Sequence, residues 1–303
     1  MTRIVHTALA AGMLTAVLSL GQTAGGASEQ APAGGQQPAA GQQPQPGQPP
    51  QGGQPPQGRG EGRGQGRGQG RGGGGARGAL PLDLEERTGF ESIFDGSMKQ
   101  WDGDPALWRI ANGMLVGQTT QQNAIKENSF VIWRGGEPAD FELKVEYRMD
   151  AGNSGIQFRS EHLAQGTPSG RGSIEGKWVL KGYQADIDHG NQYTGMIYEE
   201  RGRGFLMVRG QAIHIAPDAT KRVFGQLERN SDELKGLIKP GDWNHVHLIA
   251  RGNTIINSIN GHVTAIVIDD DPKGRSMKGR LGLQIHTGPP MKIEFRNIYL
   301  KKL

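Results

Sequence analysis

The run Phe141-Glu142-Leu143-Lys144-Val145-Glu146-Tyr147-Arg148-Met149 alternates apolar and charged residues without a break. Successive side chains of a β-strand point to opposite faces, so the apolar residues would share one face and the charged residues the other. A helix would instead repeat its apolar positions every three to four residues. Because a strand with one apolar face must bury it against another layer, this run predicts a fold of packed sheets.

Similar short runs continue to the C-terminus, and turn residues separate them. Ala111-Asn112-Gly113 and Asn260-Gly261 each lie between two apolar runs, which is a strong hairpin signal. We expect one exception, a short helix near residues 220–228 within the polar stretch from Pro217 to Lys239. Residues 80–303 are therefore predicted to form an all-β domain, an antiparallel two-sheet sandwich.

Residues 1–79 differ in composition from the rest of the chain. The apolar run from Ala8 to Leu20 is too short to span a bilayer, and small residues follow it up to Ala27. We therefore expect residues 1–27 to be a secretory signal peptide, with a retained anchor as the alternative. Residues 28–79 are rich in Gly, Pro, Gln and Arg and are predicted to be a disordered linker. The expected location is periplasmic or secreted, with no membrane span after cleavage.

The chain contains no cysteine. This absence excludes a disulfide framework, a thiolate metal site and a cysteine nucleophile. An exported protein without disulfides depends on its apolar core, so we expect that core to be sizeable.

The excess of positive charge lies in the first 79 residues. Removing their six arginines from the 34 basic residues, and Glu29 and Glu61 from the 30 acidic residues, leaves 28 of each. A nucleic-acid-binding domain is expected to carry a basic surface of its own, so we expect no nucleic-acid partner for the folded domain. The Arg-Gly repeat at residues 58–68 is interpreted as a flexible tether, with contacts to polyanions as the alternative.

The run Gly182-Tyr183-Gln184-Ala185-Asp186-Ile187-Asp188 carries a polar face. Its alternation puts Gln184, Asp186 and Asp188 on the side opposite the apolar residues. Asp and Gln are poor strand formers and like charges repel, so a functional face and a solvated face are both open readings. Other runs offer pairs that would complete one polar plate if their strands are neighbours: Glu146 and Arg148, Gln157 and Arg159, and Gln284 and His286.

Several motifs occur along the chain in a characteristic order and spacing. They are Ile93-Phe94-Asp95-Gly96, Phe141-Glu142-Leu143, Asn153-Ser154-Gly155-Ile156-Gln157-Phe158-Arg159, Gly182-Tyr183-Gln184-Ala185-Asp186-Ile187, Tyr198-Glu199-Glu200, Leu283-Gln284-Ile285-His286 and Gly288-Pro289-Pro290-Met291. Together they resemble the 3-keto-disaccharide hydrolase domain family over about residues 89–303. The resemblance implies a concanavalin A/laminin G-like jelly-roll sandwich that acts on 3-keto-glycosides as an exported hydrolase or lyase.

The implied substrate sets the requirements of the site. A ketone at C3 acidifies the hydrogen on C2, so a base can form an enolate and the aglycone can then leave from C1. We expect Asp186 or His286 to be the base, and Glu199 or Asp188 to be the acid. Arg159 and Gln284 are expected to donate to the enolate oxygen. The expected contacts to substrate come from Glu146, Arg148, Gln157, Gln184, Asp188, Tyr198 and Gln284.

The polar face also resembles, more distantly, the Glu-x-Asp-x-Glu strand of retaining glucanases. Gln184 stands where that strand has its first acid and cannot act as a carboxylate nucleophile, which argues against a glycosyl-enzyme intermediate. The alternative to an enzyme is a lectin-like carbohydrate-binding module, because the same sandwich often only binds sugar. A binding module needs aromatic platforms and few acids, so the acids of this face favour the enzyme and a small carbohydrate substrate.

No cofactor is expected. A divalent metal held by Asp186, Asp188, His189 and Glu199 is the alternative, but no histidine pair at i, i+4 supports it. Asp269-Asp270-Asp271 lacks the spacing of a calcium-binding EF-hand loop and is interpreted as a solvated turn.

Overall fold

The computed structural model describes residues 85–170 and 172–303. The signal peptide predicted for residues 1–27 and the linker predicted for residues 28–79 lie outside the described residues, so both stay predictions. Among the described residues, no helix is long and apolar enough to cross a membrane.

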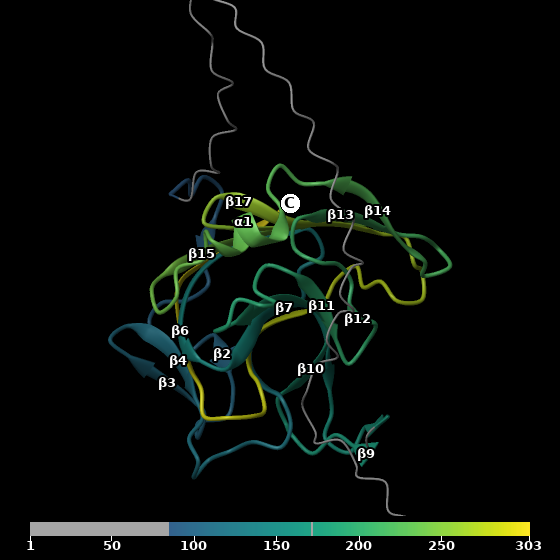
Figure 1. Cartoon of the computed structure of the whole chain (residues 1–303). Helices are drawn as coiled ribbons and strands as arrows, with labels where there is room; N and C mark the ends of the chain where they lie inside the picture. The colour runs from purple at the N-terminus through teal and green to yellow at the C-terminus, as the bar shows by residue number, and fades with distance from the viewer. Residues whose placement is uncertain (1–84, 171) are drawn as a thin grey trace, which may run out of the picture. The chain divides into compact units, whose positions relative to one another are not determined.

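Sheet A has ten strands and extends from the top of Figure 1 down its left side. A short strand, β1 (Glu91–Ser92), pairs with β19 beside the main path. The other strands follow one another in the order β14 (Lys221–Gln226), β13 (Gln211–Ile215), β17 (His262–Asp269), β16 (Thr254–Ile259), β15 (Asn244–Arg251), β6 (Phe141–Ala151), β19 (Lys292–Lys302), β4 (Met114–Gln118) and β3 (Trp108–Ala111).

Sheet B has seven strands and lies in the centre of Figure 1, below the upper part of sheet A. Its order is β12 (Gly204–Phe205), β11 (Ile197–Glu200), β10 (Val179–Asp188), β7 (Asn153–Leu163), β18 (Arg280–Ile285), β5 (Ser129–Trp133) and β2 (Trp101–Asp102). A separate small hairpin is formed by β8 (Pro168–Ser169) and β9 (Gly172–Ser173).

The two layers confirm the predicted all-β sandwich. Strand pairs in the described residues are antiparallel with one exception, since β13 runs parallel to β17. The predicted hairpin between β3 and β4 turns at Asn112 (φ 50°) and Gly113 (φ 72°). Two central residues with positive φ define the turn whose twist matches that of the flanking strands, which is why Asn-Gly was a reliable signal.

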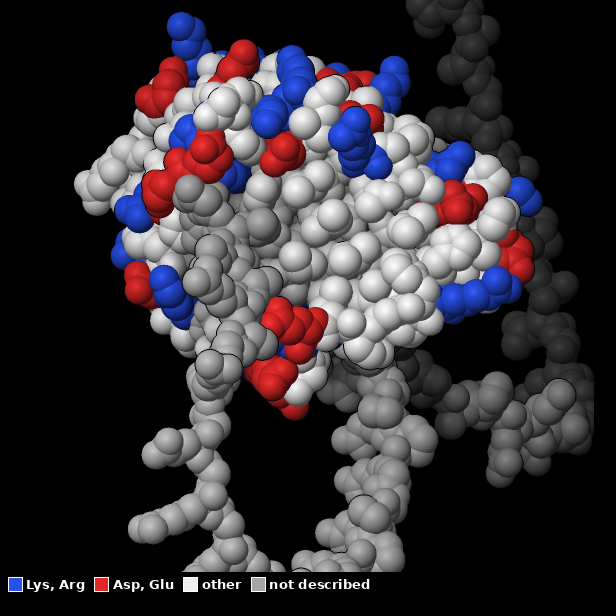
Figure 2. Space-filling model, turned by 90° about the horizontal axis from the view of Figure 1, so that it is seen from above, with Lys and Arg blue, Asp and Glu red and all other residues white. Residues whose placement is uncertain are grey.

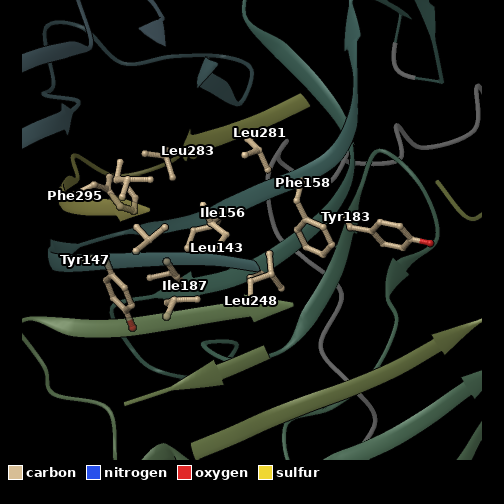
Figure 3. Packing of buried hydrophobic residues seen from close by; sticks show 14 of the residues in the cluster. Leu143, Tyr147, Ile156, Phe158, Tyr183, Ile187, Leu248, Leu281, Leu283 and Phe295 are labelled. Carbon is tan, nitrogen blue, oxygen red and sulfur yellow. The ribbon is translucent and has the colours of Figure 1, made fainter. Parts of the chain in front are cut away.

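The apolar residues of both sheets meet between the layers, as the labelled side chains in Figure 3 show. Phe158 of β7 stacks on Tyr183 of β10 at 5.5 Å between ring centroids, and Phe141 of sheet A meets Phe158 edge to face. Each fully buried side chain of this kind contributes about 1.5–3 kcal/mol to folding. The sizeable core expected for a chain without disulfides is present.

The prediction of a short helix near residues 220–228 is wrong. That segment is the edge strand β14, which contains Val223 and Phe224, residue types that favour strands. The one helix among the described residues, α1 (Ser231–Lys235), begins after it. Asn230 caps α1 by accepting from the backbone of Glu233, whose carboxylate accepts from the Asn230 N–H in return. The capping pair, rather than the polar composition, locates the helix.

Charges of both signs are interspersed on the surface. Figure 2, the view from above Figure 1, shows Lys and Arg alternating with Asp and Glu around the rim of the molecule. No face-wide basic field appears in this view, in agreement with the equal numbers of acidic and basic residues beyond residue 79.

Candidate active site

The outer face of sheet B, which points away from sheet A, collects polar residues of β7, β10 and β18. Gln184 of β10 lies opposite Gln157 of β7, and Asp186 lies opposite Gly155 one row further along. Directly opposed residues in an antiparallel pair point to the same face. Gln157, Gln184, Asp186 and Gln284 are together called the polar plate, and each is at most 1% exposed.

Gly155 leaves room for the polar plate. A Cβ at this position would lie 2.4 Å from Cδ of Gln184, so the Gln184 side chain crosses β7 where β7 has no side chain of its own. From there, Gln184 Nε2 donates a hydrogen bond of 3.1 Å to Asp186 Oδ1. Because Gly155 has no side chain, the side-chain amide of Gln184 can lie against the carboxyl group of Asp186.

Asp186 is a buried acid with one oxygen unused. Oδ1 accepts from Gln184, whereas Oδ2 has no hydrogen-bond partner. Burial, together with the carboxylates of Asp188 and Glu200, outweighs the Gln184 hydrogen bond and raises the pKa of Asp186 to about 8. At pH 7 Asp186 is therefore mostly protonated and can deliver a proton.

Unpartnered buried oxygens concentrate on this face. Each residue of the polar plate contributes one, and Asn153 Oδ1 on β7 adds another. The plate atoms are Gln157 Oε1, Gln184 Oε1, Asp186 Oδ2 and Gln284 Oε1. A buried polar atom without a partner costs about 1–3 kcal/mol, so native domains hold few of them. Their concentration on one face indicates a site for a ligand with several hydrogen-bonding groups.

Glu200 reaches across the polar plate from β11. Its Oε2 accepts from Gln284 Nε2 at 3.1 Å, and Asn128 Nδ2 lies 3.3 Å from the same oxygen. Asn128, just before β5, also accepts from the backbone N–H of Thr287 at 2.9 Å. The carboxylate thus spans from β11 to β18 and belongs to the site.

His286 follows β18 and is half-buried. Its Nδ1 lies 2.6 Å from the carbonyl oxygen of Thr287, so Nδ1 carries the proton and donates, and Nε2 is the basic nitrogen. Burial lowers the pKa of His286 although the Thr287 hydrogen bond opposes the change. At pH 7 the ring is therefore neutral.

Asp188 lies on the same face but anchors a loop. Its carboxylate accepts from the backbone N–H groups of Gln192, Tyr193 and Thr194 at 3.1, 2.7 and 2.9 Å. The Thr194 hydroxyl lies 3.2 Å from the same carboxylate. With these donors, Asp188 is already used in holding residues 189–194, in contrast to Asp186.

Glu199 does not join the polar plate, which corrects the expectation that it is the acid. It lies opposite Tyr183, whose side chain belongs to the core, so Glu199 points to the inner face of sheet B. There Arg203 Nε contacts its Oε2 at 2.6 Å. Adjacent residues of a strand cannot share a face, and Tyr198, opposite Gln184, lies on the polar side.

Arg159 also departs from the expected position. It has φ of 45°, and the register of β7 against β10 shifts beside it. Its side chain leaves the plate and donates to the carbonyl oxygens of Ala139 and Gly252 and to Asp140 Oδ1, at 2.8, 2.6 and 2.9 Å. A β-bulge redirects side chains in this way, so the simple alternation fails here.

Glu146 and Arg148 belong to β6 and therefore to sheet A. Glu146 pairs with Arg296 at 2.7 Å, and Arg148 pairs with Glu294 at 2.5 Å. The expectation that they complete the polar plate is wrong, because strand order puts them in the other sheet.

Residues 89–301 match the 3-keto-alpha-glucoside-1,2-lyase-like domain. The chain belongs to this family. The match spans the whole sandwich, including every strand of the polar plate, and supports a carbohydrate-active function. No curated protein matches.

Solved structures of low identity resemble this member of the lyase-like family. A candidate glycosyl hydrolase from Parabacteroides distasonis is 18% identical, with 71% of this chain and 99% of that chain covered and a TM-score of 0.41. A carbohydrate-binding module, CBM66 from Bacillus subtilis, is 13% identical over 67% and 96%, also with a TM-score of 0.41. A Bacillus subtilis protein with a galectin-like fold is 14% identical over 68% and 90%, with a TM-score of 0.41. The fold assignment rests on the strand order and not on these likenesses.

The lyase-like domain offers no assembled metal site within the described residues, where no group of three or more His, Asp or Glu is placed to hold an ion. The set considered above does not come together, since Glu199 and Asp186 lie on opposite faces of sheet B. The expectation of no cofactor stays a prediction.

Glu200 and Asn128 were not predicted as site residues. A signal for Glu200 was available, because Tyr198 and Glu200 are two residues apart and must share a face. For Asn128 the sequence offered no signal, since its contact with Glu200 joins residues 72 positions apart.

Proposed function

We propose that this protein is an exported enzyme, periplasmic or secreted, that cleaves the glycosidic bond of 3-keto-glycosides by acid–base chemistry on the polar plate. His286 is the base and Asp186 is the acid. Membership of the lyase-like family supports the substrate class. The observation that carries the proposal is the buried, unpartnered Oδ2 of Asp186 among other unpartnered oxygens, on a carboxyl group whose pKa burial raises.

The reaction begins at C2 of the keto-sugar. His286 Nε2 takes the proton from C2, and the electron pair of that C–H bond forms an enolate with the C3 carbonyl. The enolate then collapses: the C3 carbonyl re-forms, a double bond forms between C1 and C2, and the bond from C1 to the aglycone oxygen breaks. Asp186 gives its proton to that oxygen. The products are an unsaturated keto-sugar and a free alcohol, and later addition of water to C1 gives the 3-keto-sugar.

Opposite pKa shifts support these two roles. A base must be unprotonated and an acid must be protonated at the same pH, so a site needs two groups whose environments move their pKa values in opposite directions. The pKa of His286 is lowered and the pKa of Asp186 is raised to about 8. Near pH 7 both groups are in the required state, which favours His286 over Asp186 as the base.

The other plate residues suit a sugar. Hydroxyl groups donate hydrogen bonds, and Gln157 Oε1 and Gln184 Oε1 are acceptors that have no donor. Gln284 Nε2, which donates to Glu200, is the donor we assign to the enolate oxygen. Fixed donors directed at developing negative charge are typically the largest single contribution to such a reaction.

The proposal is tested with the full chain and two substrates, methyl 3-keto-glucoside and methyl glucoside. We expect turnover of the keto-sugar alone, and loss of turnover in Asp186→Asn and His286→Ala. Asp270→Asn and His214→Ala are matched controls, because that pair is bonded at 2.9 Å in sheet A, away from the plate. Full turnover in both plate variants would contradict the proposal. Tight binding of the sugar by the wild type without turnover would favour the carbohydrate-binding alternative.

A further inference from the structure

Three aromatic rings lie against one another beside the polar plate. Tyr193 and Phe205 stack with 5.1 Å between ring centroids and 27° between planes. Tyr198 meets Phe205 edge to face at 5.0 Å and 63°. Each of the three residues is half-buried, so each keeps part of its surface exposed. Tyr193, Tyr198 and Phe205 are called the aromatic wall.

Strand register puts the aromatic wall on the same face as the plate. Tyr198 of β11 lies opposite Gln184, and Phe205 of β12 lies opposite Tyr198. Opposed residues share a face, so the wall continues the row of the plate toward the β12 edge. Tyr193 comes from the loop that Asp188 holds, through the hydrogen bond from its own N–H at 2.7 Å. The position of the wall is therefore fixed from both sides.

The order of strands matches the order of groups along a glycoside. His286 follows β18, Asp186 is on β10, Tyr198 is on β11 and Phe205 is on β12. Neighbouring strands are roughly 4.8 Å apart, so β18 and β10 are separated by about 10 Å, enough for one sugar ring between their side chains. If His286 acts at C2 and Asp186 acts at the glycosidic oxygen, the aglycone extends beyond Asp186, away from His286. That direction leads to the aromatic wall.

We propose that the aromatic wall is the aglycone subsite, and that it selects 3-keto-glycosides whose aglycone is a ring with an apolar face. This inference rests on the proposed function for its orientation. Stacking on aromatic rings is the shared chemistry of two sources, an aromatic aglycone and the C–H face of a second sugar ring. A small alkyl aglycone would not reach the wall.

The test compares three substrates that differ only in aglycone: methyl, phenyl and glucosyl 3-keto-glucosides. The variants are Tyr198→Leu and Phe205→Leu, which keep an apolar side chain. Tyr193 and Phe205 also pack on the core, so the readout is a ratio that loss of folding does not move: kcat/KM for the phenyl or glucosyl substrate divided by kcat/KM for the methyl substrate. We expect this ratio to fall roughly 3- to 10-fold. Phe224→Leu on the edge strand β14, where Phe224 is 55% exposed, is the control and leaves the ratio unchanged.

An unchanged ratio in both wall variants for both ring substrates would overturn the inference. A fall for the phenyl substrate alone identifies an aromatic aglycone, and a fall for the glucosyl substrate alone identifies a disaccharide. If the wild type turns over none of the three substrates, the proposed function fails. Calorimetric titration with the same three ligands then tests the aglycone subsite separately. Weaker binding of the ring-bearing ligands, relative to methyl, in the wall variants would support the subsite, and equal binding would overturn it.

Discussion

Two polar clusters lie on opposite faces of sheet B, and they differ in how their hydrogen bonds are used. On the outer face, the polar plate keeps an unpartnered oxygen on each of its four residues. On the inner face is the Arg203 cluster, formed by Glu199, Arg203, Asp269 and Asp271. Arg203 forms ion pairs with all three acids, at 2.6, 2.6 and 3.2 Å. The Tyr183 hydroxyl also donates to Asp269 at 2.6 Å.

The difference separates a structural cluster from a functional one. Buried charges are stable only when paired, and the bidentate contact between Arg203 and Asp269 supplies that pairing where sheet B meets sheet A. Each residue of the polar plate keeps one oxygen without a partner in the protein, and in our proposal the substrate supplies the missing hydrogen bonds. We therefore expect changes in the Arg203 cluster to affect stability, and changes in the plate to affect turnover.

The largest expected effect is on turnover in Asp186→Asn. The amide has the same shape but cannot give up a proton, so kcat/KM for methyl 3-keto-glucoside should fall about 10²–10⁴-fold. A 4-nitrophenyl aglycone leaves without protonation, and its kcat/KM should fall much less. Steady-state kinetics with the two substrates measure the contrast. An equal loss for both would show that Asp186 is not the acid.

The next effect is on stability in Arg203→Ala. Removing the cation leaves the buried carboxylates of Glu199 and Asp269 uncompensated, which should lower the free energy of unfolding by about 3–5 kcal/mol. Urea denaturation of the variant measures this change. Arg222→Ala on β14, where the side chain is exposed, is the matched control and should change stability little. A loss of turnover in Arg203→Ala without a loss of stability would break the division between the clusters.

A third effect is a pH dependence of stability that belongs to Asp186. Its pKa is about 8 in the folded protein and about 3.9 in the unfolded chain, so between these values the folded state holds one proton more. Stability from this group is complete below the unfolded pKa and falls as pH rises toward 8. Between pH 5 and 7 the wild type should lose about 2–3 kcal/mol relative to Asp186→Asn, as measured by denaturation of both. Parallel pH curves for the two proteins would contradict the raised pKa.

A smaller effect is expected from Gly155→Ala. The new methyl group would collide with Gln184, and an overpacked site of this kind costs about 1–3 kcal/mol while displacing the amide from Asp186. We expect reduced stability together with reduced kcat. Gly225→Ala, where the nearest atom to a Cβ would be 3.6 Å away, is the control and should affect neither. Normal kcat in Gly155→Ala would show that the position of Gln184 is not important.

The sequence predicted what depends on local pattern. Alternation along 141–149 and 182–188 assigned the strands and the buried faces, and Asn112-Gly113 located a hairpin, because each signal acts within a few residues. The same period of two correctly grouped Gln184 with Asp186. By the same period Glu200, and not Glu199, shares a face with Tyr198. The expectation that Glu199 is the acid overlooked this, because Glu199 points to the inner face of sheet B.

The remaining errors came from long-range structure. Glu146 and Arg148 were expected on the polar plate, but β6 belongs to sheet A. The sequence around Glu146 does not indicate this, since strand order is decided by pairing across the whole domain. The side chain of Arg159 points away from the polar plate because of a β-bulge, and the local sequence gives no signal of that bulge. Asp269 and Asp271 are buried rather than in a solvated turn, because Arg203, more than 60 residues earlier, pairs with both.

The most direct test of the central claim, that Asp186 is a protonated acid at the centre of the active site, is the pH dependence of kcat/KM for methyl 3-keto-glucoside. We predict a bell-shaped profile for the wild type. Its acid limb lies below 6.5, where His286 gains a proton, and its alkaline limb lies near pH 8, where Asp186 loses one. In Asp186→Asn the residual activity should lack the alkaline limb. An alkaline limb near pH 8 that persists in Asp186→Asn would contradict the assignment.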